Sequence, residues 1–216
     1  MSKPKVILFD VDGILIRLPH YFSKILEEKG YKGAEKAMEQ FHSEEMNMVY
    51  NEGRGDAREM ALPYLREFGW TGTADEMFEE QFRFEKDYLD KDLIALVEKL
   101  KEDGVICCIA TDQEKYRAKY ILEEMGFKDI FDRWYVSCDI GARKCDAKFW
   151  EKVLEDLGGI VPSAQAWDII YFDDVNKNID AASNFGIRSF LFTNKIQFEN
   201  DMNMLGFDVS LNKFSS

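Results

Sequence analysis

The sequence has few cysteines, and they lack the spacing of a metal or redox motif. The four are Cys107, Cys108, Cys138 and Cys145, with no CxxC pair and no zinc-like combination with histidine. Cys107 and Cys108 lie within an apolar run, so packing in a protein core is their expected role. Free thiols of this kind predict a reducing compartment, and we expect the protein in the cytoplasm.

The chain also lacks a long hydrophobic run. No apolar stretch approaches the roughly 20 residues that cross a bilayer, so no membrane-spanning helix is expected. The first apolar run is short and ends at Asp10, which is too short and too soon acidic for a secretory signal peptide. Apolar residues nevertheless make up 46% of the 216 residues, enough to bury a large core.

Positive charge is scarce. Against 41 acidic residues stand 28 lysines and arginines, which gives a net charge of −13. Nucleic-acid-binding proteins usually have the opposite balance, so DNA or RNA is not expected as a partner. An anionic substrate would be repelled at long range and would need a metal ion or well-placed cations at its site. An acidic chain of this size could work as a monomer or weak dimer.

Short apolar runs alternate with helical patterns over most of the chain. The apolar runs are Lys5–Asp10, Val105–Thr111, Trp134–Ser137, Ile169–Asp173 and Arg188–Thr193. Because they are almost continuously apolar, they predict parallel strands that are covered on both faces. Helical patterns lie between the later runs, at Gln113–Met125, Asp146–Leu157 and Asn176–Phe185. This order predicts an α/β, Rossmann-like three-layer sandwich, with a short helix and a loop after Phe198.

The stretch from Arg17 to Asp90 contains no convincing strand. Its helical segments, separated by glycines, are Tyr21–Lys29, Ala34–Tyr50, Asp56–Phe68 and Ala74–Tyr88. We predict an all-helical insertion at residues 17–90 in a core domain of residues 1–16 and 91–216. In the loop from Tyr50 to Gly55, two glycines flank Arg54. This loop could be a lid tip that contacts the substrate, or only a connection between helices.

Polar residues follow three predicted strands at their carboxyl ends, where open α/β sheets bind ligands. They are Asp10-Val11-Asp12-Gly13, Thr111-Asp112 and Asp173-Asp174, and Lys144 lies in the loop after another strand. Converging carboxylates repel each other unless a cation neutralises them. Since only oxygen ligands are on offer, Mg²⁺ is the expected cofactor, with Asp10, Asp12, Asp173 and Asp174 as candidate ligands. Whether Asp173 binds metal directly or orders metal-bound water is open.

The spacing within the DVDG turn suits covalent catalysis. Asp10 can present its carboxylate to both a metal and an electrophile, and Asp12 can return towards the same site as a general acid and base. Thr111 offers a hydroxyl donor, and Lys144 offers a positive charge for the nucleophile and a phosphate. A DxDG turn alone is weak evidence, since acidic turns after strands are common.

Together the segments resemble the haloacid dehalogenase superfamily. DVDG at 10–13, Thr111, RKCDAKFW at 143–150 and YFDDVNKNIDAA at 171–182 match its four motifs in order. SCDIGARK at 137–144 looks like its small-molecule phosphatase branch, which acts on sugar phosphates. The resemblance implies an aspartyl-phosphate on Asp10 and Mg²⁺ bound by Asp10, the Asp12 carbonyl and Asp174. It also implies that the helical insertion is a cap of the C1 type.

Two positions depart from the family pattern. Asp112 stands where many relatives have asparagine, which removes an amide donor to phosphate and leaves the backbone N–H; Cys145 stands where proline is common. Thr111, Asp112, Lys144 and Arg54 are the candidate substrate-binding residues. The expected activity is hydrolysis of a small phosphate monoester. A phosphomutase of the β-phosphoglucomutase type and a non-catalytic ligand-binding module remain alternatives, whereas Asp12 and the acidic pair disfavour a dehalogenase.

Overall fold

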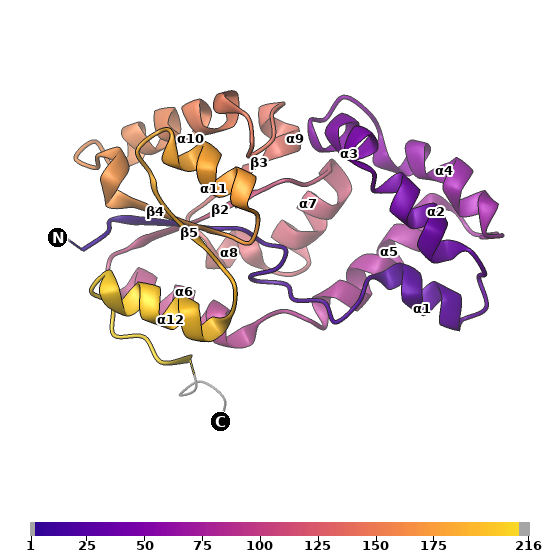
Figure 1. Ribbon diagram of the computed structural model, residues 1–216, viewed down its shortest axis with the longest axis horizontal. Coiled ribbons are helices and arrows are strands. Elements are labelled where there is room, and N and C mark those ends of the chain that lie inside the picture. The colour runs from indigo at the N-terminus through magenta and orange to yellow at the C-terminus, as the bar shows by residue number, and fades with distance from the viewer. Residues whose placement is uncertain (1–2, 212–216) are drawn as a thin grey trace.

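A parallel sheet forms the centre of the protein. The structure, a computed structural model, describes residues 3–211, and within these it has one sheet of five parallel strands in the order β3-β2-β1-β4-β5 (Figure 1). The strands are β1 (Val6–Phe9), β2 (Ile106–Thr111), β3 (Arg133–Val136), β4 (Ile169–Asp173) and β5 (Arg188–Leu191). Each lies within an apolar run that the sequence predicted as a strand, apart from one residue at the start of β3, so the predicted fold class is confirmed.

Helices cover both faces of the sheet and make three layers (Figure 1). One face carries α6 (Lys91–Glu102), α7 (Lys115–Glu123), α8 (Phe127–Ile130) and α12 (Lys195–Met204), and the other carries α10 (Ala147–Ile160) and α11 (Asn176–Ser183). Successive β1 side chains point to opposite layers. Phe9 packs in the cluster with α6 and α12, and Leu8 packs in the cluster with α10. This two-sided burial explains the unbroken apolar run of β1.

Strand register decides which polar residues meet. Phe9 pairs with Ile109 in β2 and with Phe172 in β4, so these three strands end nearly in line. Asp10 and Asp173 each lie one position beyond the paired residues Phe9 and Phe172. Thr111 lies two positions beyond Ile109, so all three residues share one edge of the sheet.

The helical insertion lies to one side of the sheet (Figure 1). It comprises α1 (Phe22–Glu28), α2 (Ala34–Phe41), α3 (Glu44–Asn51), α4 (Ala57–Glu67) and α5 (Ala74–Lys86), and it has a hydrophobic cluster of its own that includes Phe41, Leu65 and Phe78. The single helix predicted over Ala34–Tyr50 is wrong. Ser43 has extended backbone angles and begins α3 as its N-cap residue, followed by two glutamates in the first turn.

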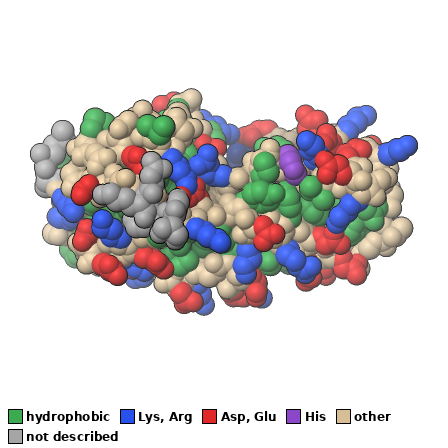
Figure 2. Space-filling view, turned by 90° about the horizontal axis from the view of Figure 1, so that it is seen from below, with side chains coloured by type: hydrophobic (Ala, Val, Ile, Leu, Met, Phe, Trp, Pro, Cys, Tyr) green, Lys and Arg blue, Asp and Glu red, His purple; other side chains and the backbone are tan. Residues whose placement is uncertain are grey.

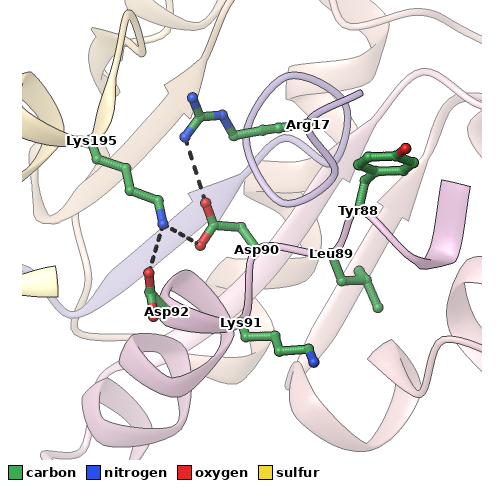
Figure 3. A pocket seen from close by; sticks show the side chains of 7 residues that line it. All are labelled: Arg17, Tyr88, Leu89, Asp90, Lys91, Asp92 and Lys195. Atoms are coloured by element: carbon green, nitrogen blue, oxygen red, sulfur yellow. Dashed lines mark hydrogen bonds and ion pairs between the residues drawn. The ribbon is translucent and has the colours of Figure 1, made fainter. Parts of the chain in front are cut away.

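Two adjacent linkers join the insertion to the sheet. The Arg17 N–H donates to the Tyr88 carbonyl at 3.2 Å, and the Asp90 N–H donates to the Leu15 carbonyl at 2.8 Å. Lys195, the first residue of α12, contacts both Asp90 and Asp92 from the side, and Arg17 also contacts Asp90 (Figure 3). These residues line an open cavity of about 400 Å³ beside the linkers.

The remaining elements and the surface complete the description. The short elements are α9 (Ser137–Ile140) and the 3₁₀ turn Ala166–Asp168. The tail predicted after Phe198 is helical to Met204, and its last five residues lie outside the described part. Acidic and basic side chains are mixed over both halves of the face in Figure 2. Within residues 3–211, no helix combines the length and apolar character needed to cross a membrane.

Candidate active site

Lys144 joins two carboxylates at the carboxyl edge of the sheet. Its Nζ atom lies 2.7 Å from Asp10 Oδ1 and 2.7 Å from Asp173 Oδ2. The three side chains are almost fully buried, with exposures of 3%, 7% and 0%. The Val11 N–H also donates to Asp10 Oδ1 at 2.7 Å, which leaves Oδ2 as the oxygen available for a ligand. The structure therefore brings the predicted nucleophile and lysine into direct contact.

Burial and charge act against each other on this pair. Burial holds the pKa of Asp10 well above its usual range, and Asp173 and Asp12 raise it further, while Lys144 opposes them. Burial lowers the pKa of Lys144, but Asp10 and Asp173 outweigh it and leave that pKa raised, so the amine stays charged. A second cation near Asp10 would further favour its ionised form.

Three carboxylates could hold that cation. Ligand oxygens of Asp10, Asp173 and Asp174 all lie within 4.8 Å of one another, a hard-oxygen set suited to Mg²⁺. Asp173 is already engaged by the protein: it accepts from the Val175 N–H at 2.7 Å, from Asn178 at 3.1 and 3.2 Å, from Lys144 and from the Tyr171 hydroxyl. Asp174 is exposed. This difference favours Asp10 and Asp174 as direct ligands and Asp173 as the residue that positions Lys144.

Gly13 keeps the space beside Asp174 open. Its φ is +75°, and a Cβ at this position would lie 2.1 Å from Asp174 Oδ2. The turn after β1 therefore needs glycine both for its backbone angle and for the neighbouring carboxylate.

Asp12 belongs to a separate group of charges. Arg117 in α7 donates from Nη1 to Asp12 Oδ2 at 2.8 Å and from Nη2 to Oδ1 at 2.6 Å. Gln113 also donates to Oδ2, at 2.7 Å. Partial removal from water raises the pKa of Asp12, but Arg117 and the Gln113 hydrogen bond outweigh it and lower the pKa. The two aspartates of the DVDG turn thus have different cationic partners.

Thr111 and Asp112 lie beside this group. Thr111 is buried, and its hydroxyl is 3.4 Å from Gln113 Nε2. Asp112 accepts the Lys144 backbone N–H at 2.8 Å and faces Arg143 Nε at 3.5 Å. The extra negative charge at position 112 is therefore neutralised by Arg143 and helps to hold the lysine loop. Binding of substrate by Thr111 and Asp112 stays a prediction.

The candidate lid loop packs against the core. A Cβ on Gly53 would lie 2.6 Å from the carbonyl oxygen of Cys138 in α9, a few residues before Lys144. Arg54 itself is 53% exposed and pairs with Glu52 at 2.9 Å. The loop thus reaches the neighbourhood of the site, and the role of Arg54 in substrate binding stays a prediction.

A comparison with known protein families matches one family over the part of the chain that contains both the sheet and the motifs. The model for haloacid dehalogenase-like hydrolases matches residues 4–186. The chain belongs to this family. Its match therefore spans all four predicted motifs and the helical insertion between the first two.

Solved structures of other haloacid dehalogenase-like proteins share the fold. An enzyme of this family from Bacteroides thetaiotaomicron aligns with a TM-score of 0.73 at 15% identity, over 93% of this chain and 99% of its own. A structure of that enzyme in complex with magnesium and inorganic phosphate aligns at 0.68 and 16% identity, over 88% and 94% of the two chains. A predicted family hydrolase from Porphyromonas gingivalis aligns at 0.72 and 16% identity, over 94% and 98%.

A local likeness links the chain to a much longer curated protein. A stretch of 73 residues is 32% identical to the drimenol cyclase drtB of Aspergillus calidoustus. It spans 34% of this chain but only 13% of the cyclase.

Sequence reasoning missed Arg117, Gln113 and Glu85 in this hydrolase. A signal for two of them was present, because Gln113 and Arg117 are four residues apart on a predicted helix that begins just after Thr111. Such a helix start must lie at the same sheet edge as the motifs. The buried Glu85 carried no local signal, since it reaches the site only through the packing of α5 on α7.

Proposed function

We propose that this hydrolase is a Mg²⁺-dependent phosphatase that acts on a small phosphate monoester through an aspartyl-phosphate on Asp10. The observation that carries the proposal is the placement of the two DVDG carboxylates. Asp10 is held by Lys144 beside the metal-type carboxylates, and Asp12 is held separately by Arg117. Two aspartates in different environments suit a nucleophile and a proton carrier.

The first step forms the covalent intermediate. A carboxylate oxygen of Asp10 attacks phosphorus in line, the bond from phosphorus to the ester oxygen breaks, and Asp12 gives a proton to the departing alcohol. Because Arg117 lowers the pKa of Asp12, the carboxyl group must take up that proton before this step, and the second step restores it. Lys144 keeps its charge beside Asp10 and the incoming phosphate, and the Thr111 hydroxyl can donate to a phosphate oxygen.

The second step releases phosphate. Asp12 takes a proton from a water molecule, which attacks phosphorus and breaks its bond to Asp10. Asp10, Asp174 and the Asp12 carbonyl would hold Mg²⁺, which when bound stabilises negative charge on the phosphate group. The magnesium and phosphate complex of the Bacteroides enzyme supports this choice of ion and substrate group.

The identity of the alcohol depends on the helical insertion, which we propose acts as a cap. The likeness of SCDIGARK to sugar-phosphate phosphatases favours a phosphorylated sugar or similar metabolite. The loop from Tyr50 to Gly55, which contacts α9, is the part of the insertion best placed to contact the group beyond the phosphate.

The test is release of inorganic phosphate from p-nitrophenyl phosphate and a panel of sugar phosphates. We expect turnover with Mg²⁺, loss of turnover after chelation with EDTA, and no turnover in Asp10→Asn. Asp129→Asn, which removes an exposed carboxylate in α8, is the control for charge and should keep wild-type activity. Turnover that persists in Asp10→Asn would refute the mechanism, and an isomerised sugar phosphate in place of free phosphate would identify a phosphomutase.

A further inference from the structure

We propose that Arg117 is a positioning residue for Asp12, and that Glu85 makes this positioning depend on the placement of the helical insertion. The three side chains are called here the charge network. The proposal deepens the proposed function, on which it rests only for the proton-transfer role of Asp12.

Arg117 uses its whole guanidinium group. Nη1 and Nη2 donate to the two oxygens of Asp12 at 2.8 and 2.6 Å, and Nε donates to Glu85 Oε2 at 2.6 Å. A planar arginine fork in this geometry fixes the plane of the carboxylate as well as its distance. A lysine could supply the charge but could not hold both oxygens.

Burial makes the network costly to separate. The side chains of Arg117 and Glu85 are 10% and 5% exposed, whereas that of Asp12 is 51% exposed. Loss of either buried partner would leave a charge away from water without its counterion. Gln81 and Gln113 complete the arrangement, since they donate to Glu85 Oε1 at 2.9 Å and to Asp12 Oδ2 at 2.7 Å.

The network crosses from the insertion to the sheet domain. Glu85 lies in the last turn of α5, Arg117 lies in the first turn of α7, and Asp12 follows β1. Phe82 and Tyr120 pack together beside it, with ring centroids 5.4 Å apart, so α5 and α7 contact each other directly. A displacement of α5 must therefore move Glu85 relative to Arg117. Because Arg117 also holds Asp12, the displacement would change the position of the Asp12 carboxylate as well.

The kinetic test compares Arg117→Gln, Arg117→Lys and Glu85→Gln. A shift of a catalytic group by about 1 Å can cost about 100-fold in rate, and we expect kcat of Arg117→Gln to fall by about that factor with KM nearly unchanged. Arg117→Lys should recover part of the loss. Lys119→Gln and Glu79→Gln, exposed positions on the same two helices, should match the wild type. Equal kcat in Arg117→Gln and the wild type would overturn the proposal.

A double variant tests the path from Glu85. If Glu85 acts through Arg117, the variant Arg117→Gln/Glu85→Gln should lose no more kcat than Arg117→Gln alone. If the fold-loss in kcat of the double variant equalled the product of the two single-variant losses, Glu85 would act independently of Arg117, and that part of the proposal would be overturned.

A readout without substrate separates this proposal from the proposed function. In urea unfolding, the destabilisations by Asp12→Asn and Glu85→Gln should be non-additive when Arg117 is present and additive in an Arg117→Gln background. Additive effects in both backgrounds would overturn the network. If the wild type released no phosphate from any ester, the proposed function would fail, and this unfolding cycle would still decide whether Arg117 couples the two carboxylates.

Discussion

A single missing side chain at Gly13 protects the carboxylate of Asp174. In Gly13→Ala, the new methyl group would lie 2.1 Å from Asp174 Oδ2, and a φ of +75° would cost about 1 kcal/mol. We expect this variant to remain folded, to lose most of the proposed phosphatase activity and to need more Mg²⁺ for what remains. Phosphate release measured over a Mg²⁺ titration, together with thermal melting, checks both effects.

Gly104→Ala is the matched control for Gly13→Ala. Gly104 has a φ of +83°, but a Cβ there would meet nothing within 4 Å. Its backbone strain should be similar and its activity unchanged. If both variants lose activity equally, the effect comes from the backbone and not from the contact with Asp174.

At the level of single residues, the sequence motifs predicted which residues lie at the site better than they predicted which side chains pair with each other. The meeting of Asp10 and Asp174 at one sheet edge could be predicted because the strand ends of a parallel sheet converge, whereas Lys144 was predicted from its place in RKCDAKFW. Arg117 contacts Asp12 across 105 positions and Glu85 across 32, and no local pattern encodes such distances. The use of Asp112 to hold the Lys144 loop was equally hidden, because a carboxylate that accepts a hydrogen bond from a distant backbone N–H leaves no mark in the sequence.

At the level of elements, buried strands were predicted better than helix boundaries. The strands β1 and β4 were recognised because each is buried along its whole length and has a continuous apolar run, whereas the edge strands β3 and β5 are only partly buried. The sequence prediction included no helix at α6, although Leu93, Leu96, Val97 and Leu100 have helical spacing and Asp90 precedes them as N-cap residue. The four residues of α9 are too few for a periodic pattern, and tertiary contacts determine them.

The start of α4 joins helix capping to a contact with the core. Asp56 Oδ1 accepts from the backbone N–H groups of Arg58 and Glu59 at 3.0 and 3.3 Å. Its Oδ2 accepts from Lys115 Nζ at 2.7 Å and from the Tyr116 hydroxyl at 2.6 Å. Burial raises the pKa of Asp56, but the bonds from Lys115 and Tyr116 outweigh it and lower the pKa to about 2.

Asp56→Asn should therefore have a pH-dependent effect on stability. The folded pKa of about 2 is below the ordinary 3.8, so the charged form contributes stability above about pH 4 that is lost as the pH falls through 2. Asparagine still caps the helix, and we expect a loss of about 1 kcal/mol at pH 7 that shrinks below pH 4. Urea unfolding at pH 7 and pH 3 measures the difference; a constant loss at both values would contradict the assignment.

At the level of the whole molecule, the insertion meets the sheet domain through several charged pairs, beside the packing of Phe82 on Tyr120. Besides Glu85 with Arg117 and Asp56 with Lys115, Glu44 of α3 pairs with Arg143 at 2.7 Å and with Lys177 at 3.3 Å. Interfaces of this polar kind allow relative motion more readily than apolar ones. They suit the proposed cap, which must open for substrate and product while its own hydrophobic cluster stays intact.

The linkers are where such a motion would be controlled, and Lys195 ties the second of them to α12. Its Nζ atom lies 2.8 Å from Asp90 Oδ1 and 2.8 Å from Asp92 Oδ2, and the Asp90 side chain is only 7% exposed (Figure 3). In Lys195→Met, Asp90 keeps Arg17 at 3.6 Å as its remaining cation, so the paired linkers should open more often. We expect faster hydrogen exchange at the Arg17 and Asp90 amides, which bond across the linkers, and unchanged exchange in β1 and β4. Lys152→Met breaks an exposed pair with Glu155 in α10. This control should change neither the exchange at the linker amides nor the exchange in the strands. Exchange at Arg17 and Asp90 that equals the wild type would show that the linkers are held by their backbone bonds and not by Lys195.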